Sequence, residues 1–279
     1  MMPLRTEPRV VGLVSARMAS SRYPGKAIVP LAGRPLLQVL LERVASVPCL
    51  DSVCLATSRQ RENLVLFEIA NALGIPTFQG DEEDVLRRHV EAARIMKADH
   101  VVRITGDNPL TDLETIERLV ELHLREQADY TYVPGDALLM GILPEVVSRR
   151  ALELSWERGE ARHRSELVTL YIKEHPGEFR ISIGSLPEGL YRPDLRLTVD
   201  EAADVELMQR LFERLQRPGR QVSTRAAIEL LEREPALAAI NAHLRHKAPN
   251  LRSVQLDEAI LAAKRRAGGP AGSPEGRTP

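Results

Sequence analysis

The loop SARMASSRYPGKAIVPLAG, which follows the apolar run VVGLV near the start of the chain, holds the first residues suited to chemistry. It combines three cations with two adjacent serines: Arg17, Arg22, Lys26, Ser20 and Ser21. Serine hydroxyls and backbone N–H groups bind phosphate oxygens, while Arg and Lys neutralise their charge. The loop matches neither G-x-G-x-x-G nor G-x-x-x-x-G-K-[ST], so it indicates a polyphosphate site of another type. Composition alone leaves open the alternative of a solvated basic loop.

Two aspartates also follow apolar segments. Asp107 comes after HVVRIT within T-G-D-N-P, and Asp200 comes after the apolar part of LRLTVDEAAD. Carboxylates at the carboxyl ends of strands line the ligand crevice of an open α/β sheet, and Mg²⁺ prefers such oxygens. Each aspartate alone also fits a plainer role, a turn residue for Asp107 and a helix N-cap for Asp200. Together with the basic loop they predict a nucleotide–magnesium site, which Asp204, one helical turn further on, could also face.

Other side chains that often do chemistry are interpreted as structural or solvated. Cys49 and Cys54 have no second pair of ligands, so we interpret them as small apolar thiols and not as a zinc site. The chain has no G-x-S-x-G motif and no H-x-x-x-H spacing, so nothing indicates covalent catalysis or a histidine metal site. Solvated surface positions are predicted for four histidines: His89, His123, His163 and His175.

The elements that would position these residues alternate regularly over the first half of the chain. Strands are predicted at Val10–Ser15, Ser52–Thr57, Pro76–Phe78, His100–Thr105 and Ala128–Val133. Amphipathic helices are predicted between them, at Pro35–Val47, Arg61–Leu73, Asp81–Met96 and Asp112–Arg125. This alternation predicts an α/β fold with a mostly parallel, twisted sheet and helices on both faces.

Beyond residue 133 the pattern is less regular. Strands are predicted at 142–148, 179–185 and Leu195–Val199, and helices at Arg149–Glu157, Arg164–Glu174, Glu201–Leu215 and, as a pair, over 223–244. We therefore expect one domain over residues 1–265, with an excursion at about 134–190 before the chain returns to the sheet. The Gly- and Pro-rich end, 266–279, is predicted to be a disordered tail.

Charge and hydropathy exclude two classes of partner. The chain of 279 residues carries 38 Lys and Arg against 39 Asp and Glu, so no net field favours nucleic acid or an anionic membrane. No apolar stretch is long enough to span a bilayer, and the first residues, MMPLRTEPRVVG, carry charge where a signal peptide needs an apolar core. We expect a cytoplasmic protein that binds small molecules.

Four blocks of sequence resemble one enzyme family. ARMASSRYPGKAIVPLAGRPLL is similar to the nucleotide-binding motif of the sugar-acid cytidylyltransferases, which include the KDO and acylneuraminate enzymes and, most closely, the SpsF-like spore-coat polysaccharide type. The resemblance continues through GDEEDVLRR, ADHVVRITGDNPLTD and RPDLRLTVDEAADVELM, in the family's order, and spans about residues 8–215.

The resemblance implies a GT-A-like nucleotidyltransferase fold, CTP as donor, Mg²⁺ as cofactor, and a homodimer. Carried over by position, it implies catalytic roles for Arg17, Arg22, Lys26, Asp107 and Asp200, the two aspartates holding the metal. Nucleotide contacts are implied for Ala16, Arg17, Met18, Ser20, Ser21, Arg22, Lys26, Asp84, Arg103 and Gly106, with Arg103 and the segment 80–88 near the cytidine. Acceptor contacts are implied for Glu145 and Glu166.

The expected reaction is transfer of CMP from CTP to a sugar acid or related polyol, with release of pyrophosphate. Two departures from the SpsF-like pattern fall in the acceptor half: Leu143 stands where Asp is common, and Glu166-Leu167-Val168-Thr169 lacks a histidine. A third replaces Thr-Ala-Asp-Cys-Pro by T-G-D-N-P. Two alternatives stay open, a GT-A glycosyltransferase, weakened by the lack of a D-x-D pair, and a nucleotide-binding protein without turnover.

Overall fold

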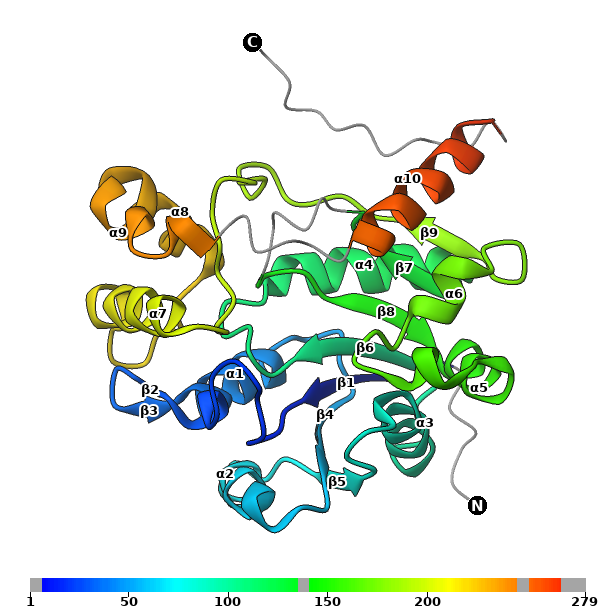
Figure 1. Cartoon of the computed structure of the whole chain (residues 1–279), viewed down its shortest axis with the longest axis horizontal. Coiled ribbons are helices and arrows are strands. Elements are labelled where there is room, and N and C mark those ends of the chain that lie inside the picture. The colour runs from blue at the N-terminus through cyan, green and yellow to red at the C-terminus, as the bar shows by residue number, and fades with distance from the viewer. Residues whose placement is uncertain (1–6, 135–140, 245–250, 267–279) are drawn as a thin grey trace.

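The computed structural model describes residues 7–134, 141–244 and 251–266, which are built around a seven-stranded sheet (Figure 1). The strands follow the order β5-β4-β1-β6-β8-β7-β9. Their bounds are β1 Val10–Ser15, β4 Ser52–Ser58, β5 Thr77–Gly80, β6 His100–Thr105, β7 Tyr130–Tyr132, β8 Glu145–Ser148 and β9 Ile181–Ile183. Neighbouring strands are parallel except where β8 pairs, because β8 runs antiparallel to both β6 and β7. The predicted fold class, a mostly parallel sheet with flanking helices, is confirmed.

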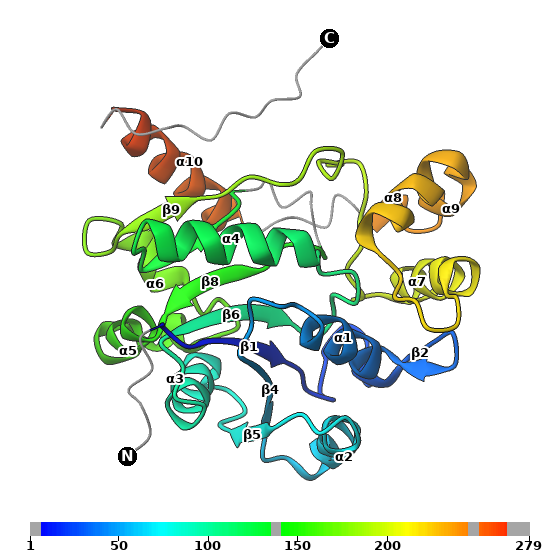
Figure 2. The ribbon, with the colours of Figure 1, turned by 180° about the vertical axis from the view of Figure 1, so that it is seen from behind.

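Helices cover both faces of the sheet, as two opposite views show (Figures 1 and 2). One face packs α3 Val85–Ile95, α5 Arg149–Arg158 and α6 Leu170–Glu174 against Val11 and Leu13 of β1. The other face packs α1 Leu36–Ala45, α2 Leu64–Ala72 and α4 Leu113–Arg125 against Val10 and Val14. Because β1 is apolar on both faces, it lies in the middle of the sheet, as a buried parallel strand should.

A third apolar cluster lies beside the sheet and holds the later part of the chain. It joins α7 Ala202–Leu215, α8 Thr224–Arg233 and α9 Pro235–Ala239 to the short hairpin of β2 Pro30–Leu31 and β3 Arg34–Pro35. The last described helix, α10 Leu251–Arg266, docks against α6 and buries Ile260. Short 3₁₀ turns complete the described structure at Lys26–Ile28, Arg61–Asn63, Ala161–Arg164 and Ala242–Leu244.

The prediction of a strand at Leu195–Val199 is wrong. These residues are buried but form no ladder, and Val199 N–H donates to Asp107 O at 2.9 Å as an isolated link. Their apolar side chains pack against α7 and α8 in the third cluster, so these side chains are buried by helices and not by the sheet. A buried strand and an irregular segment buried against helices show the same apolar pattern, so the sequence did not distinguish the two.

Three further elements are shorter than predicted. The helix expected over Arg164–Glu174 is interrupted, leaving the 3₁₀ turn Ala161–Arg164 and α6, and between them Glu166 O accepts from Arg103 Nη2 at 2.8 Å. Helix α3 begins four residues later than expected, since Asp81 accepts from the backbone N–H groups of two following residues in an Asx turn. The strand expected over 142–148 likewise starts only at β8.

The prediction of solvated histidines is wrong for three of the four. His89, His123 and His163 are buried, and each hydrogen-bonds to the protein; His175 is half-buried. Cys49 and Cys54 are unpaired thiols, half-buried and buried, as their interpretation requires. Within the described residues no helix is long and apolar enough to cross a membrane. Helix α10 was not predicted, and it includes Arg266, the first residue of the predicted tail. The rest of that tail lies outside the described residues. The single-domain organisation stays a prediction.

Candidate functional site

A cavity of about 540 Å³ lies at the carboxyl ends of β1 and β6, the edge where α/β sheets bind ligands. Its wall comes from the loop after β1, the end of β6, the start of α3 and the segment around Glu166. Most of the predicted site residues line it: Ala16, Arg17, Ser20, Ser21, Arg22, Lys26, Arg103, Gly106, Asp107 and Glu166. The fold therefore brings together residues that are up to 150 positions apart in the sequence.

The loop after β1 is held in shape by its own backbone. Met18 O accepts from Ser20 N–H and Gly25 N–H, both at 3.0 Å, and Gly25 has φ +76°, which favours glycine. Met18 N–H in turn donates to Oδ1 of the buried Asn63 at 2.7 Å. Met18 thus contributes its backbone to the loop, while its side chain packs against the core and does not line the cavity.

Gly106 allows the ends of β1 and β6 to touch. Its N–H donates to Ser15 O at 2.7 Å, and a Cβ at this position would lie 2.6 Å from both Ser15 O and Ala16 Cβ. Any larger residue would push the two strand ends apart, so Gly106 shapes the cavity floor by close packing.

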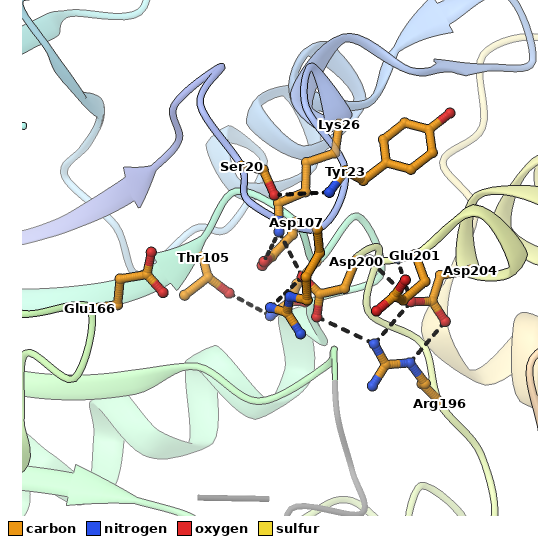
Figure 3. Close-up of polar contacts among 12 residues, drawn as sticks. Ser20, Tyr23, Lys26, Thr105, Asp107, Glu166, Arg196, Asp200, Glu201 and Asp204 are labelled. Atoms are coloured by element: carbon orange, nitrogen blue, oxygen red, sulfur yellow. Dashed lines mark hydrogen bonds and ion pairs between the residues drawn. The ribbon is translucent and has the colours of Figure 1, made fainter. Parts of the chain in front are cut away.

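The two predicted metal-binding aspartates converge on one lysine (Figure 3). Lys26 Nζ lies 2.6 Å from Asp107 Oδ2 and 2.7 Å from Asp200 Oδ1, and Arg22 Nη2 lies 2.8 Å from the same oxygen of Asp200. We call Arg22, Lys26, Asp107 and Asp200 the phosphate cluster. It joins three distant parts of the chain: the loop after β1, the turn after β6 and the segment before α7.

Asp200 is held in place by a second group of charged residues, Arg196 and Asp204. Arg196 Nη2 lies 3.3 Å from Asp200 Oδ2 and pairs with Asp204 through Nε at 2.8 Å. Asp204 also accepts from the backbone N–H groups of Asp200 and Glu201, at 3.0 Å each, and from Asn241 Nδ2 at 2.8 Å. Asp204 therefore holds Asp200 in place and points away from the cavity, and the helix N-cap is Glu201 and not Asp200.

Charge pairing decides the ionisation of the phosphate cluster. Burial alone would lower the pKa of the Lys26 ammonium, but Asp107 and Asp200 outweigh it, so the pKa lies above its ordinary value. Burial alone would raise the pKa of Asp107, but Lys26 outweighs it, so this pKa lies below its ordinary value. Lys26 and Asp107 are therefore both charged at neutral pH.

The donor atoms of this cluster fit a hard divalent cation. Two carboxylates converge on one point, and the neighbouring Asn108 Oδ1 is buried without a hydrogen-bond partner among the described residues. The part of the chain that the structure describes contains no group of three His, Cys, Asp or Glu arranged for a metal. A cation here would therefore draw its remaining ligands from substrate oxygens and water, as Mg²⁺ commonly does.

On the α3 side, the cavity is lined by Ser15, Val85, Arg88, His89 and Arg103, which we call the α3 wall. Behind it Arg103 Nη1 lies 2.7 Å from Glu145 Oε2. The other oxygen of Glu145 accepts from the Tyr130 hydroxyl and, at 3.1 Å, from Thr169 Oγ1. Burial would raise the pKa of Glu145, but Arg103 and then Lys173 hold it below its ordinary value. Glu145 does not line the cavity, contrary to its predicted contact with an acceptor.

Glu166 and Asp84, the remaining predicted residues, differ in position. Glu166 lines the cavity, and its carboxylate lies 2.6 Å from Arg17 Nη2. Asp84 instead caps α3 by accepting from Arg87 N–H at 2.8 Å, and it pairs with Arg164 at 3.0 Å. Asp84 is absent from the cavity wall, so the structure gives no support to its predicted nucleotide contact.

Several lining residues were not predicted from the sequence: Ser15, His89, Thr105, Asn108 and Thr198. Arg88 also lines the cavity, and it belongs to the segment 80–88 that was expected near the cytidine. Thr105 and Asn108 flank Asp107 in the motif already singled out, so adjacency was an available signal. His89 follows the apolar Val85 by four positions and thus shares its helix face, which signals burial against the sheet.

A sequence model of the family described as cytidylyltransferase matches residues 11–239 of this chain. The chain belongs to the cytidylyltransferase family. Members of this family are CTP-dependent nucleotidyltransferases, so the resemblance seen in the sequence is confirmed and the glycosyltransferase alternative is not supported. The matched residues include the whole phosphate cluster and end before α10.

Individual relatives agree with this assignment. The cytidylyltransferase is 34% identical over 235 residues to the spore coat polysaccharide biosynthesis protein SpsF of Bacillus subtilis, covering 82% of this chain and 96% of that protein. It is 38% identical over 117 residues to a 3-deoxy-manno-octulosonate cytidylyltransferase of Syntrophobacter fumaroxidans, covering 40% of this chain and 46% of that protein. A solved cytidylyltransferase structure from Leptospira borgpetersenii superposes with a TM-score of 0.76 at 25% identity, covering 83% and 97% of the two chains.

Proposed function

We propose that the phosphate cluster binds the triphosphate of CTP together with one divalent cation, and that the cavity beside it holds an acidic sugar that receives CMP. One observation carries this proposal: the Lys26 ammonium, which lines the cavity, lies between two carboxylates, 2.6 and 2.7 Å from their oxygens. Such a cluster has both the cation that a phosphate needs and the anions that a metal needs.

The charges of the cluster support a metal–nucleotide complex as its ligand. Three cations, Arg22, Lys26 and Arg196, face Asp107, Asp200 and Asp204, so the site is close to neutral by itself. A bare triphosphate would meet the Asp107 carboxylate in the cavity wall, whereas a triphosphate carrying a divalent cation is attracted to both signs of charge. Mg²⁺ is the proposed ion, held by Asp107 and Asp200. When bound, it would supply charge neutralisation at the phosphate oxygens.

The residues of the chain have a positioning and electrostatic role in the proposed reaction. An acceptor oxygen attacks the α-phosphorus in line, its new bond forming as the bond to the pyrophosphate oxygen breaks. Arg22 and Lys26 neutralise the charge that accumulates on the departing pyrophosphate. Ser20 and Ser21, which line the same loop, offer hydroxyls to the phosphate oxygens. No nucleophile of the protein takes part.

An acidic acceptor is supported by the cavity and by relatives. Arg88 and Arg103 supply positive charge along the α3 wall, which suits a carboxylate. Glu166 presents a carboxylate to the same space and suits the hydroxyls of a sugar. SpsF acts in spore coat polysaccharide biosynthesis by its name, and the second relative is named for an eight-carbon sugar acid. Glu145 acts on the acceptor through Arg103 in this proposal. We also propose that the protein is a homodimer and that it acts in the cytoplasm, where CTP is made.

A pyrophosphate-release assay tests the proposed function. The purified protein is supplied with Mg²⁺, one nucleoside triphosphate at a time, and a panel of sugar acids and polyols with and without phosphate groups. We expect pyrophosphate from CTP with at least one acidic sugar, and none when EDTA removes the metal. Absence of pyrophosphate with every acceptor, or hexose transfer from a nucleotide sugar, would contradict the proposal. Light scattering after size-exclusion chromatography tests the dimer.

A further inference from the structure

The α3 wall contains a hydrogen bond that the proposed chemistry does not use. Ser15 Oγ lies 2.9 Å from His89 Nε2, and His89 Nδ1 lies 2.8 Å from the backbone oxygen of Val85. Both residues line the cavity, Ser15 half-buried and His89 fully buried. This pair lies on the sheet face covered by α3, while the 3₁₀ turn of Lys26 packs on the opposite face, beside α1.

The proton on each atom of this pair is determined. A carbonyl oxygen only accepts, so His89 Nδ1 carries a hydrogen and donates it to Val85 O. Burial, followed by the nearby Arg103 charge, lowers the pKa of His89 to about 3, so the ring is neutral and Nε2 carries no hydrogen. The Ser15 hydroxyl must therefore donate to Nε2. With its hydrogen held in this way, Ser15 Oγ presents only lone pairs to the cavity.

A hydrogen-bond acceptor with no free hydrogen distinguishes two pyrimidine nucleotides. At ring position 4 cytosine carries an amino group, which donates, and uracil carries a carbonyl oxygen, which accepts. A site built to accept from an amino group rejects the carbonyl analogue, because two acceptors would then face each other without a hydrogen. Ser15 is also the register partner of Thr105, directly before the turn that holds Asp107, so a nucleotide anchored by its phosphates can reach both.

We propose that Ser15 Oγ accepts a hydrogen bond from the 4-amino group of cytosine, and that His89 is the positioning residue that makes Ser15 select CTP over UTP. The proposal rests on the proposed function, since it assumes that the nucleotide lies in this cavity. Within the α3 wall it assigns Ser15 to the base, while Arg88 and Arg103 stay with the acceptor, and it makes the choice of nucleotide depend on one hydroxyl hydrogen.

Binding of CTP and UTP tests this selection without any need to know the acceptor. Dissociation constants are measured by calorimetry with Mg²⁺ for the natural protein, Ser15→Ala, Ser15→Thr, His89→Leu and, as a control away from the cavity, Ser46→Ala. We expect Ser15→Ala to weaken CTP about 10- to 100-fold and UTP less than about threefold, since only the amino group loses a partner. Ser15→Thr, which keeps the hydroxyl, should preserve most of the preference, and Ser46→Ala should preserve all of it.

His89→Leu gives a result that a purely structural role would not produce. Without Nε2 the Ser15 hydroxyl is free to rotate and donate to a carbonyl, so UTP should bind about tenfold tighter while CTP changes little. An unchanged CTP-to-UTP ratio in Ser15→Ala would overturn the inference, as would a natural protein that binds both nucleotides equally. If His89→Leu does not fold, the two Ser15 variants still decide. If the natural protein does not bind CTP at all, the proposed function itself fails.

Discussion

Two charged clusters border the same cavity and have different roles. The first is the phosphate cluster. The second, which we call the Glu145 cluster, consists of Arg103, Glu145, Tyr130 and Thr169. Their acidic members are similarly withdrawn from water, with Asp107 and Glu145 side chains 21% and 16% exposed. Both oxygens of Glu145, however, already have protein partners, and Glu145 is absent from the cavity wall, whereas Asp107 lines it. Asp200 resembles Glu145 in both respects, so Asp107 is the carboxylate that the phosphate cluster presents to the cavity.

The comparison shows that exposure does not identify a functional carboxylate. Asp107 lines the cavity beside a lysine that can exchange its partners for a phosphate, and Arg22, the outermost cation, is half exposed. Glu145 is a fully satisfied anion that fixes Arg103. The first cluster is organised for ligands and the second for rigidity, so substitutions in the first should mainly lower turnover and those in the second should mainly lower stability.

Loss of the lysine in the phosphate cluster should have the largest effect. Lys26→Met removes the cation from between Asp107 and Asp200, and we expect the rate of pyrophosphate release to fall by about 10³-fold or more. Lys97→Met, at an exposed lysine after α3, is the matched control and should retain full activity. Steady-state assays with CTP measure both. A Lys26→Met enzyme within tenfold of the natural rate would mean that the phosphate cluster is not the site of pyrophosphate departure.

Loss of the charge in the Glu145 cluster should affect stability first. Glu145→Gln leaves Arg103 without its anion in a buried site, and we expect the free energy of unfolding to fall by about 2–4 kcal/mol. Turnover should fall only about tenfold, because Glu145 acts through Arg103. Urea unfolding followed by circular dichroism measures the change. Unaltered stability combined with complete loss of turnover would show that Glu145 contacts the substrate and would erase the distinction between the clusters.

Acid titration tests the groups that are buried without charge. The pKa values of His89 and His123 are both lowered to about 3, chiefly by burial, from an ordinary value of 6.5. Because these pKa values are lower in the folded protein than in the unfolded one, the neutral histidines contribute stability that is fully present above pH 6.5. This contribution is lost as the pH falls toward 3. Each histidine should add about 1.4 kcal/mol per pH unit to the slope between about pH 6 and 4.5. Urea unfolding at several pH values measures the slope.

His123 allows that slope to be assigned. Its two ring nitrogens bond His100 and Thr131, away from the cavity wall, so His123→Gln leaves the nucleotide site intact. We expect the slope in His123→Gln to fall by about 1.4 kcal/mol per pH unit, which corresponds to one proton. An identical slope in the natural protein and in His123→Gln would refute the assignment.

The exposed ion pair at the cavity mouth should have the smallest effect on stability. Glu166 is 71% exposed, and pairs of this kind contribute little. Glu166→Gln should change the free energy of unfolding by less than about 0.5 kcal/mol. It should raise the KM for the acceptor several-fold if Glu166 binds sugar hydroxyls. An unchanged KM for the acceptor would exclude Glu166 from the acceptor site. The pairing with Arg17 would then be the only role of Glu166.

The sequence was sufficient for the parts of the fold that repeat a local pattern. The apolar runs of β1 and β6 and the helices that follow each strand gave the parallel half of the sheet. The insertion of β8 between β6 and β7 was not predictable from local pattern, because it depends on pairing partners distant in the sequence. Helix α10 was missed for a related reason: it docks through Asp257, which pairs with Lys173 at 2.9 Å and contributes no motif of its own.

The site divides in the same way. Residue types near predicted strand ends indicated Lys26, Asp107 and Asp200, because charge and position suffice to suggest a phosphate or metal role, although the strand predicted before Asp200 does not form. Glu145 was assigned to the acceptor from its place in a motif, and only the folded structure shows both its oxygens taken. His89 was assigned to the surface because a histidine in an amphipathic helix has no local sign of its partner, which lies 74 residues earlier.

The most direct test of the two clusters compares turnover and stability in one variant, Asp107→Asn. This change keeps the shape of the side chain and removes the charge that faces Lys26. We expect pyrophosphate release from CTP to fall by about 10³-fold or more while the free energy of unfolding changes by less than about 2 kcal/mol. A folded Asp107→Asn enzyme that retains more than a tenth of the natural rate would contradict a ligand-binding role for the phosphate cluster.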